Sequence, residues 1–481
     1  MCIWFSFRTI SAESKTKPPY SNLTKNFQKK RFFLCMKNFS PDEQLQAAIH
    51  IIKTLVENGY EALFAGGWVR DYLMGNREPG DIDIATNATP ESIAELFSHT
   101  LNVGEQFGVM VVIYRAIPFE VATFRCDVGI SDGRHPQNVV FTDSKTDALR
   151  RDFTINGMFY DPFSEKVIDY VGGKEDIEKG VVRCIGNPDE RFEEDYLRML
   201  RAVRFAAEFD FSIEDQTYEG IERAASYIKK VSPERIFTEL DKMLRGANPD
   251  LGMKILHQTG LLKETLPEVE DLVGVKQPPQ FHPEGDVFSH TLKALHLLQP
   301  SPSSSLAWSV LLHDVGKPPT MSYQDRIRFN NHHHVGAVMS VGILKRLRVS
   351  NNLTENVKTM VENHMNFMNV RNMRLSTLKK FLTRPTLQEE LELHRVDCLA
   401  SHGDLSNYHF VKLRLSEFKK EQLKPDPLLS GKDLIGLGFR PGPLFGRILG
   451  KVYDLQLEET IKSKDQAIGY VEERYRDLKK E

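Results

Sequence analysis

"LFAGGWVRDYLMGNREPGDIDIAT", residues 63–86, combines a diglycine, an arginine–aspartate pair and two alternating aspartates in one short span. Gly66 and Gly67 follow an apolar run and precede a stretch typical of a helix. Glycines at a strand-to-helix turn let the backbone approach a phosphate closely, and a helix N-terminus supplies free N–H groups. A diglycine alone is a weak signal, because most such pairs are ordinary turns. The stretch as a whole predicts a phosphate-binding turn.

The two alternating aspartates are the sharper part of this stretch. On a strand, Asp81 and Asp83 project from one face while Ile82 and Ile84 pack behind them. Mg²⁺ is bound in proteins by carboxylate oxygens together with substrate phosphates. An isolated Asp-x-Asp is more often a solvated strand edge, but the nearby diglycine and Arg-Asp pair favour a metal site.

Length and composition limit the protein class. With 481 residues, the chain is too long for one core and predicts roughly two to four domains. The formal net charge of -3 gives no sign of a polyanion partner. It does not exclude a local basic groove, because the distribution of charge matters more than its sum. The five cysteines include no Cys-x-x-Cys pair, which argues against a disulfide framework and fits a cytoplasmic location.

Neither a membrane span nor a secretory signal is expected. No apolar stretch approaches the ~20 residues needed to cross a bilayer, so no membrane partner is predicted. The first 35 residues are basic, with Glu13 as the only acid, and lack a long apolar core. An organelle transit peptide is one interpretation of this segment. A true start at Met36, before a capped helix, is the preferred one.

Hydrophobic patterning divides the chain into a mixed head and a helical remainder. A helix is predicted over 41–58 with Ser40 as its N-cap, and a long mobile loop near a site over 126–145. Short β-branched or aromatic runs predict strands at 62–65, 109–114, 119–124 and 167–171.

Beyond residue 191 the strand signals nearly vanish. Apolar residues recur at helical spacing over 192–208 and 233–246, with Pro/Ser breaks at 300–305 and 424–431. The predicted parts are an N-terminal extension that is disordered or not translated (1–40), a mixed α/β head (41–185), a helical neck (186–250), a helical body (251–410) and a helical tail (411–481).

The head and neck motifs together resemble class II nucleotidyltransferases, the CCA-adding tRNA enzymes and bacterial poly(A) polymerases. "GGWVRD…DIDIAT" is similar to the family signature, and "RRDFTINGMFYDP" (150–162) to its second motif. "RFEEDYLRMLRAVRFAAEF" (191–209) resembles the nucleotide-selecting motif, and "SPERIFTEL" (232–240) the neck motif. The resemblance implies an α+β fold, in which a small mixed β-sheet nucleotidyltransferase head precedes a mostly α-helical neck, body and tail.

The resemblance also implies roles for residues of the head. Asp81 and Asp83 would hold two Mg²⁺ ions, one activating the RNA 3′-hydroxyl and the other steadying the triphosphate as pyrophosphate leaves. Glu120 is a candidate third catalytic carboxylate, with an exposed strand glutamate as the open alternative. The nucleotide-binding candidates in the head are Gly66, Gly67, Arg70, Asp71, Arg151, Asp152 and Asn156. For Asp152, a helix cap is the open alternative.

The sequence "EDYLR", residues 194–198, matches the base-selecting motif of the family. Asp195 and Arg198 lie three residues apart, so on one helix they would share a face and offer an acceptor and donors to a base edge. A surface ion pair is the open alternative. Arg201 and Arg204 continue the helix and could reach phosphates or brace Glu194.

Histidines concentrate in the body, where eleven of the fifteen lie between His282 and His409. Imidazole and carboxylate ligands suit Mn²⁺, Fe²⁺, Ni²⁺ or Zn²⁺. The pattern resembles the HD-domain phosphohydrolases, which implies metal-assisted hydrolysis of phosphomonoesters or cyclic phosphodiesters. Lys317 could bind a substrate phosphate or be solvated. The predicted core ligands are His290, His313, Asp314 and Asp397, with His332 and His364 completing a binuclear site.

The predicted function is therefore template-independent addition of C, C and A to tRNA 3′ ends, with tRNA, CTP and ATP as partners. Three alternatives share these motifs: an A-adding enzyme, a CC-adding enzyme and a poly(A) polymerase. An alternative of another class is an HD phosphohydrolase with a non-catalytic RNA-binding head. RNA contacts are expected from the neck and tail, with 235–246 and 436–452 as candidates. The oligomeric state is not predicted.

Overall fold

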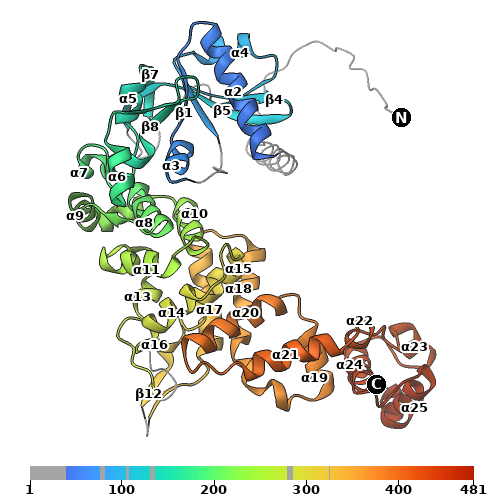
Figure 1. Cartoon of the computed structure of the whole chain (residues 1–481). Coiled ribbons are helices and arrows are strands. Elements are labelled where there is room, and N and C mark those ends of the chain that lie inside the picture. Colours follow the sequence, from blue (N-terminus) through green and yellow to red (C-terminus); the bar gives the residue numbers. More distant parts are fainter. Residues whose placement is uncertain are drawn as a thin grey trace, which may run out of the picture. The chain divides into compact units, whose positions relative to one another are not determined.

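The computed structural model describes residues 40–75, 82–104, 108–130, 136–278, 285–323 and 326–480. The chain forms two compact units, one up to Ile177 and the other from Glu178 onward (Figure 1). The predictions for the N-terminal extension, Asp81 and His282 fall outside the described residues. Within the described residues, no helix is long and apolar enough to span a membrane.

The first unit is built on a mixed sheet. Its described residues form seven strands in the order β3-β4-β5-β2-β1-β8-β9. β2 and β5 run parallel, and the other pairs in this sheet are antiparallel. The strands are β1 (Ala62–Ala65), β2 (Asp83–Thr86), β3 (Thr100–Gly104), β4 (Val109–Tyr114), β5 (Ile117–Thr123), β8 (Met158–Asp161) and β9 (Lys166–Asp169).

Helix α2 (Pro41–Glu57) covers one face of this sheet. The predicted cap is confirmed, because Ser40 and Glu43 form a capping box and Pro41 occupies the first turn. Ile51 of α2 is buried in a core with Ile84 of β2. The short helices of the unit are α3 (Gly67–Leu73), α4 (Pro90–Leu96), α5 (Ser144–Leu149) and the 3₁₀ turn η3 (Thr154–Asn156), and α6 (Gly173–Lys179) spans the sequence boundary between the units.

A second core lies on the opposite face of the sheet, around Ala65, Ala85 and Phe159. Side chains alternate along a strand, so Ile84 belongs to the first core and Ala85 to the second. Asp83, two residues before Ala85, therefore faces the same side as Ala85. This face carries the candidate site.

The polar stretch 126–145 differs from the predicted long loop. It contributes to an antiparallel pair, β6 (Arg125–Ile130) and β7 (Pro136–Phe141). The prediction of a single loop is wrong, because Val139, Val140 and Phe141 supply β-forming residues next to the turn-forming Gly/Asp segment.

The second unit is almost entirely helical and begins with the neck. The described elements of the neck include a short parallel strand pair, β10 with β11. They are β10 (Val181–Val182), α7 (Pro188–Glu194), α8 (Leu197–Phe209), β11 (Ser212–Ile213), α9 (Asp215–Ala224), η4 (Ala225–Lys230), α10 (Pro233–Leu244), α11 (Pro249–Gln258), α12 (Leu261–Thr265) and α13 (Pro267–Glu270).

The body follows with helices that surround the histidine cluster. The predicted break at 300–305 is confirmed, because α14 ends at His296 and α15 begins at Ser304. The elements are α14 (Val287–His296), α15 (Ser304–Leu312), α16 (Lys317–Thr320), β12 (Met321–Tyr323), β13 (Ile327–Phe329), α17 (His332–Arg346), α18 (Asn351–Asn363), η5 (His364–Asn372), α19 (Leu375–Leu382) and α20 (Leu387–Ala400).

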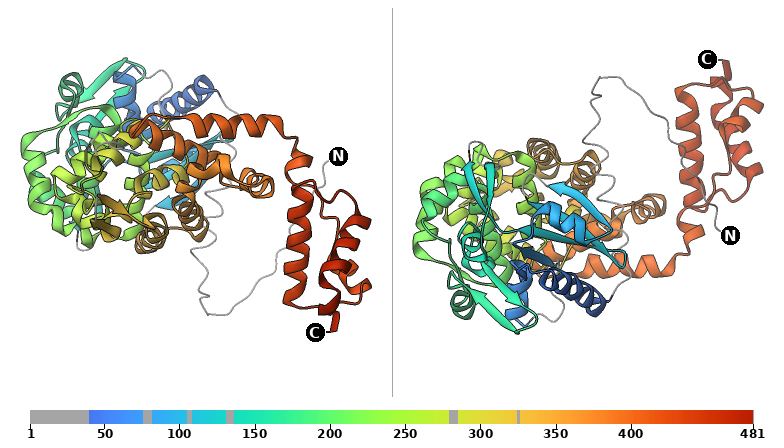
Figure 2. Two further views of the ribbon diagram at one scale, coloured as in Figure 1. Left: turned by 90° about the horizontal axis from the view of Figure 1, so that it is seen from below. Right: turned by 90° about the horizontal axis from the view of Figure 1, so that it is seen from above.

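Among the C-terminal helices, α23, α24 and α25 are drawn in red in Figure 2, and α24 packs against both of the others. The break predicted at 424–431 is confirmed, because it separates α22 from α23. Phe439, Ile448 and Val452 of the stretch 436–452 are buried in the core of these helices, so these three side chains have a structural role. The elements are α21 (Ser406–Glu417), α22 (Lys420–Leu423), α23 (Gly431–Gly436), α24 (Pro443–Leu457), α25 (Lys464–Tyr475) and η6 (Arg476–Lys480).

Candidate active site and candidate metal centre

Two carboxylates lie side by side on the sheet of the first unit. Asp83 of β2 is the register partner of Glu120 of the parallel neighbour β5. Residues paired in this way face the same side of a sheet, with the strands ~4.8 Å apart. Both residues are exposed. The sequence could not relate Glu120 to Asp83, because the pairing of β2 with β5 is a tertiary contact.

The diglycine turn lies against Asp83. Gly66 precedes α3 with a φ of 66°, a conformation that favours glycine. A Cβ atom at this position would lie 3.1 Å from Arg151 Nη1 and 4.0 Å from Asp83 Oδ2. The adjacent Gly67 is the first residue of α3. The turn, the Asp83 carboxylate and the Arg151 guanidinium therefore meet at one point of the fold.

Arg70 of α3 is held by a polar chain. Its Nε donates to Asp71 Oδ1 at 2.8 Å, and its Nη1 donates to Asn156 Oδ1 at 2.7 Å. Asn156 Nδ2 in turn donates to Asp152 Oδ1 at 3.3 Å. Asp152 also accepts from the Phe153 N–H, and its side chain does not cap η3. The predicted nucleotide-binding residues of both head motifs are thus linked by hydrogen bonds.

Asp147 of α5 organises the two arginines of the second motif and was missed by the sequence analysis. It is 1% exposed, and its Oδ2 accepts from Arg151 Nε at 3.1 Å and Nη2 at 2.9 Å. Arg150 Nη2 binds the other oxygen at 2.6 Å. Burial alone would raise the pKa of the Asp147 carboxyl, but Arg151 and Arg150 outweigh it and hold the pKa below its ordinary value. The i, i+3 and i, i+4 spacing in "TDALRR" was the available signal.

In the neck, the expectation that Asp195 and Arg198 share one helix face is wrong. α7 ends at Glu194, and Asp195 has an extended backbone with φ at -157° and ψ at 101° before α8 begins. Its carboxylate accepts from Arg235 Nη1 at 3.2 Å and Nη2 at 2.6 Å, and from the Leu197 N–H at 3.1 Å. No ion pair between Asp195 and Arg198 is present within this described segment.

Arg198 is paired with Glu194 instead. The same Glu194 carboxylate also accepts from Arg191 Nη1 at 2.8 Å, while Arg198 Nη1 donates to the Arg191 carbonyl at 3.0 Å. Arg191 and Arg198 therefore brace Glu194, whereas Arg204, one of the two arginines considered for that role, pairs with Glu239.

Arg204 forms a buried ion pair across the neck. Its Nε donates to Glu239 Oε2 of α10 at 2.7 Å, and both side chains are largely buried. The Arg201 guanidinium lies 5.3 Å from the centre of the Phe205 ring. Another residue of α10, Asp241, accepts a hydrogen bond at its Oδ1 from Trp308 Nε1 at 3.1 Å. Together with the bonds of Arg235, these contacts place Arg235, Glu239 and Asp241 in internal hydrogen bonds. All three belong to the stretch 235–246, which was a candidate for RNA contact.

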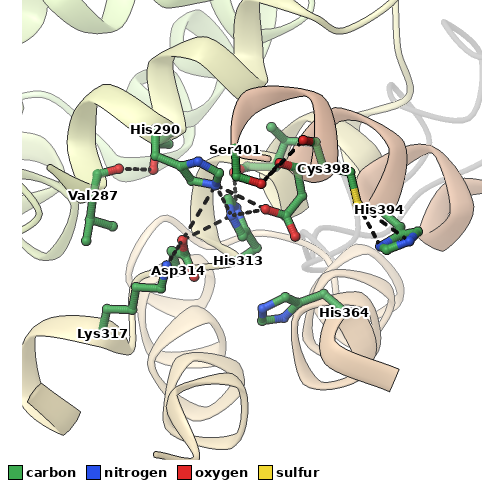
Figure 3. A network of polar contacts seen from close by, with 12 residues as sticks. Val287, His290, His313, Asp314, Lys317, His364, His394, Cys398 and Ser401 are labelled. Atoms are coloured by element: carbon green, nitrogen blue, oxygen red, sulfur yellow. Dashed lines mark hydrogen bonds and ion pairs between the residues drawn. The ribbon is translucent and has the colours of Figure 1, made fainter. Parts of the chain in front are cut away.

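The body brings the predicted HD residues together. His290 Nε2 lies 3.3 Å from His313 Nε2 and 3.1 Å from Asp397 Oδ1. His313 Nε2 lies 3.2 Å from Asp314 Oδ2. Figure 3 shows His290, His313 and Asp314 turned toward one another, from α14 and from the end of α15. These atoms are close enough to ligate one ion.

A second group shares Asp314. His332 Nε2 lies 3.2 Å from His364 Nε2 and 3.5 Å from Asp314 Oδ1. Each of three imidazoles has its Nδ1 within hydrogen-bond distance of a backbone carbonyl: 2.8 Å for His313, 2.9 Å for His332 and 2.6 Å for His364. A carbonyl can only accept, so each of these Nδ1 atoms donates its proton to the carbonyl and Nε2 is the ring nitrogen left to bind a metal. This arrangement is typical of metal-ligating histidines.

The electrostatics of the centre also fit a metal. Asp314 Oδ2 is buried and accepts no hydrogen bond of good geometry, although Lys317 Nζ lies 2.7 Å away. Burial lowers the pKa of His364 to about 3, with further lowering by His313 and His332, so this imidazole is neutral. A neutral imidazole and an ionised carboxylate are the protonation states that metal binding needs.

Lys317 was predicted either to bind a substrate phosphate or to be solvated. The structure contradicts the second alternative. Only 6% exposed, it donates from Nζ to Gln277 Oε1 at 2.6 Å. Gln277 was missed by the sequence analysis, because nothing in the local sequence relates it to a residue 40 positions away.

Three family models match the chain. The "Poly A polymerase head domain" covers residues 62–183, and the "Probable RNA and SrmB-binding site of polymerase A" covers 210–272. The "HD domain" covers 287–401. The three matches follow the order of the head, neck and body.

Several similar proteins and solved structures are named CCA-adding enzymes. A CCA-adding enzyme of Lactococcus lactis subsp. cremoris (strain SK11) is 32% identical over 435 residues, covering 89% of this chain and 96% of that protein. One of Bacillus pumilus (strain SAFR-032) is 44% identical over 230 residues, which span 48% of this chain and only 57% of that protein. The crystal structure of the Bacillus stearothermophilus CCA-adding enzyme in complex with CTP has 26% identity and a TM-score of 0.71, covering 90% of this chain and 98% of that one. The chain belongs to the CCA-adding enzyme family.

Proposed function

We propose that the protein is a template-independent RNA nucleotidyltransferase that adds C, C and A to tRNA 3′ ends from CTP and ATP. The observation that carries the proposal is the meeting of Asp83, its register partner Glu120, the Gly66 turn and Arg151 on one face of the sheet. The likeness to the CTP-bound B. stearothermophilus enzyme supports CTP as a substrate. A Thermotoga maritima CCA-adding enzyme complexed with tRNA shares the fold, at 19% identity and a TM-score of 0.56.

The residues of the head would bind and orient the nucleotide. Arg70 and Arg151 present guanidinium groups that suit triphosphate oxygens, since guanidinium binds phosphate in a bidentate way. Asp147 holds Arg151 in one orientation through two hydrogen bonds, which lowers the cost of ordering that side chain on binding. The absence of a Cβ atom at Gly66 lets the Arg151 guanidinium approach the turn closely.

The carboxylates of the head suit Mg²⁺. Asp83 and Glu120 offer hard oxygen ligands on adjacent strands, and Asp81 would add a third. Bound Mg²⁺ would supply positive charge that favours the alkoxide form of the RNA 3′-hydroxyl and neutralises the leaving pyrophosphate.

Nucleotide selection is assigned to Asp195 and Arg198, each of which is held by a different partner. Arg235 fixes the Asp195 carboxylate through two hydrogen bonds, and Glu194 pairs with Arg198. These partners hold one acceptor group and one donor group at the start of α8. Such fixed groups can distinguish bases by their hydrogen-bonding edges, because a mismatched base leaves polar groups unpaired.

Replacing Arg235 with lysine tests this assignment. The Arg235→Lys variant is expected to misincorporate UTP about tenfold more often relative to CTP, because lysine cannot hold both Asp195 oxygens. The measurement is kcat/KM for each nucleotide on tRNA that lacks CCA. Arg223→Lys is a matched control, since Arg223 binds both oxygens of the exposed Asp189. Unchanged selectivity in Arg235→Lys would remove the positioning role.

The proposed activity is tested with tRNAs that end before CCA, after C and after CC, each supplied with CTP, ATP or both. Incorporation of C, C and A followed by arrest is the expected result. Addition of A alone or of CC alone would identify a partial enzyme. Open-ended incorporation of A would identify a poly(A) polymerase, and each of these outcomes contradicts CCA addition.

A second function, metal-dependent phosphohydrolysis, is favoured by the buried centre of the body. Five of its six predicted ligands form two groups that share Asp314, and the sixth, Asp397, lies 3.1 Å from His290 Nε2. A transition metal such as Ni²⁺, Mn²⁺ or Fe²⁺ suits this mixed imidazole and carboxylate set. When bound, the metal would supply an activated water for attack on phosphorus. Lys317, buried beside Asp314, would help to fix that carboxylate.

A further inference from the structure

Two tyrosines and a lysine of the neck form a surface cluster that none of the assigned roles uses. Tyr196, at the start of α8, stacks on Tyr227 of η4, with ring centres 5.3 Å apart and planes inclined by 25°. Lys230 Nζ lies 4.5 Å from the centre of the Tyr227 ring and 5.2 Å from that of Tyr196. We refer to Tyr196, Tyr227 and Lys230 as the tyrosine–lysine cluster.

The cluster is accessible to a ligand. Tyr227 is 47% exposed, and Lys230 is exposed as well. Within the described parts of the chain, no carboxylate pairs with Lys230, whereas the adjacent Lys229 pairs with Glu264. The Tyr227 ring is thus exposed at the surface, and the Lys230 ammonium beside it has no carboxylate partner among the described residues.

The chemistry of the cluster matches single-stranded nucleic acid. Proteins bind unpaired nucleotides by stacking bases on aromatic rings next to positive charges that contact the backbone. The cluster offers both, because Tyr196 supports the Tyr227 ring from one side and Lys230 lies over both rings. Ring and cation lie next to each other, so one nucleotide could use both.

The position of the cluster selects the RNA strand as its occupant. Tyr196 directly follows Asp195, which is assigned to nucleotide selection, so the cluster includes the chain neighbour of that residue. Tyr227 and Lys230 also fall inside residues 210–272, which match a probable RNA-binding model. We propose that Tyr227, supported by Tyr196, stacks an unpaired base near the 3′ end of the RNA while Lys230 contacts its phosphate. The proposal rests on the proposed nucleotidyltransferase function.

The test uses the full chain and labelled tRNA lacking CCA, with Kd measured by fluorescence anisotropy from about 50 to 200 mM salt. Tyr227→Leu is expected to raise Kd about tenfold at every salt concentration, because it removes the stacking face. Tyr227→Phe keeps the ring and is expected to bind within about twofold of the wild type. Lys230→Met is expected to reduce the slope of log Kd against log salt by about 0.7, the value for one lost contact to a single strand.

Two substitutions serve as matched controls. Tyr323→Leu removes an exposed tyrosine of β12, and Lys229→Met removes a lysine that is already paired. Both are expected to bind RNA as the wild type does. In the incorporation assay, Tyr227→Leu is expected to raise KM for tRNA and leave KM for CTP unchanged, a split that a purely structural role would not produce.

The outcomes separate this inference from the proposed function. Wild-type affinity in Tyr227→Leu, or an unchanged salt slope in Lys230→Met, would overturn the tyrosine–lysine cluster as an RNA contact. Equal weakening by Tyr227→Leu and Tyr227→Phe would also overturn it, because stacking needs only the ring. Absence of nucleotide incorporation by the wild type would instead refute the nucleotidyltransferase, whatever the affinities.

Discussion

Replacing Asp83 with alanine is expected to lower nucleotide incorporation about a thousandfold, equivalent to ~4 kcal/mol of lost transition-state stabilisation. The reason is positional, because Asp83 is a carboxylate on the face where the Gly66 turn and Arg151 meet. The measurement is single-turnover incorporation of CTP into tRNA lacking CCA. Since Asp83 is exposed at the start of β2, its removal leaves the sheet cores intact.

Glu95→Gln is a matched control for Asp83→Ala, because Glu95 is an exposed carboxylate of α4 in the same unit. It is expected to keep wild-type activity. The Glu120→Gln variant tests whether Glu120 is a catalytic carboxylate. A large loss of kcat would identify it as one. A wild-type kcat would identify it as an exposed strand residue without a catalytic role. Wild-type incorporation by Asp83→Ala would contradict the assignment of the active site.

Replacing His313 with alanine is expected to remove bound transition metal and to lower phosphohydrolase activity at least about a hundredfold. His313 belongs to the group with His290 and Asp314, and its Nδ1 bond to Val310 directs Nε2 into the centre. Metal content of the purified protein and hydrolysis of a 2′,3′-cyclic phosphodiester are the two measurements. Nucleotide incorporation is expected to be unchanged, since the nucleotidyltransferase residues lie elsewhere in the chain.

His334→Ala is the control for His313→Ala, because His334 is an exposed neighbour of the ligand His332 and pairs with Glu362. It is expected to retain metal and hydrolysis. If His313→Ala keeps full metal content, the cluster is not the metal site. If it loses metal while the wild type shows no hydrolysis, the centre has a structural role and the phosphohydrolase proposal fails.

Local patterns were sufficient where the determinants are close in sequence. Ser40, Glu43 and Pro41 lie within one turn, and the cap they predict is present. The strands at 62–65 and 109–114 have the predicted bounds, because their apolar residues alone specify burial on the sheet. The helical and mixed parts of the fold could therefore be predicted from the sequence.

The partners of the site residues could not be predicted in the same way. Arg235 follows Asp195 by 40 positions, and Gln277 precedes Lys317 by 40, so only tertiary packing brings each pair together. Asp195 was misplaced for a related reason: helical spacing over 192–208 does not show a two-residue interruption when the flanking segments are both helical.

The bond between Asp195 and Arg235 constrains how the protein can evolve. A neutral residue at 195 would leave a guanidinium unpaired in a partly covered position. Any lineage that changes the base preference at this point is therefore expected to change both positions together, as a covarying pair. A single substitution at 195 is therefore expected to lower the stability of the neck as well as alter the site.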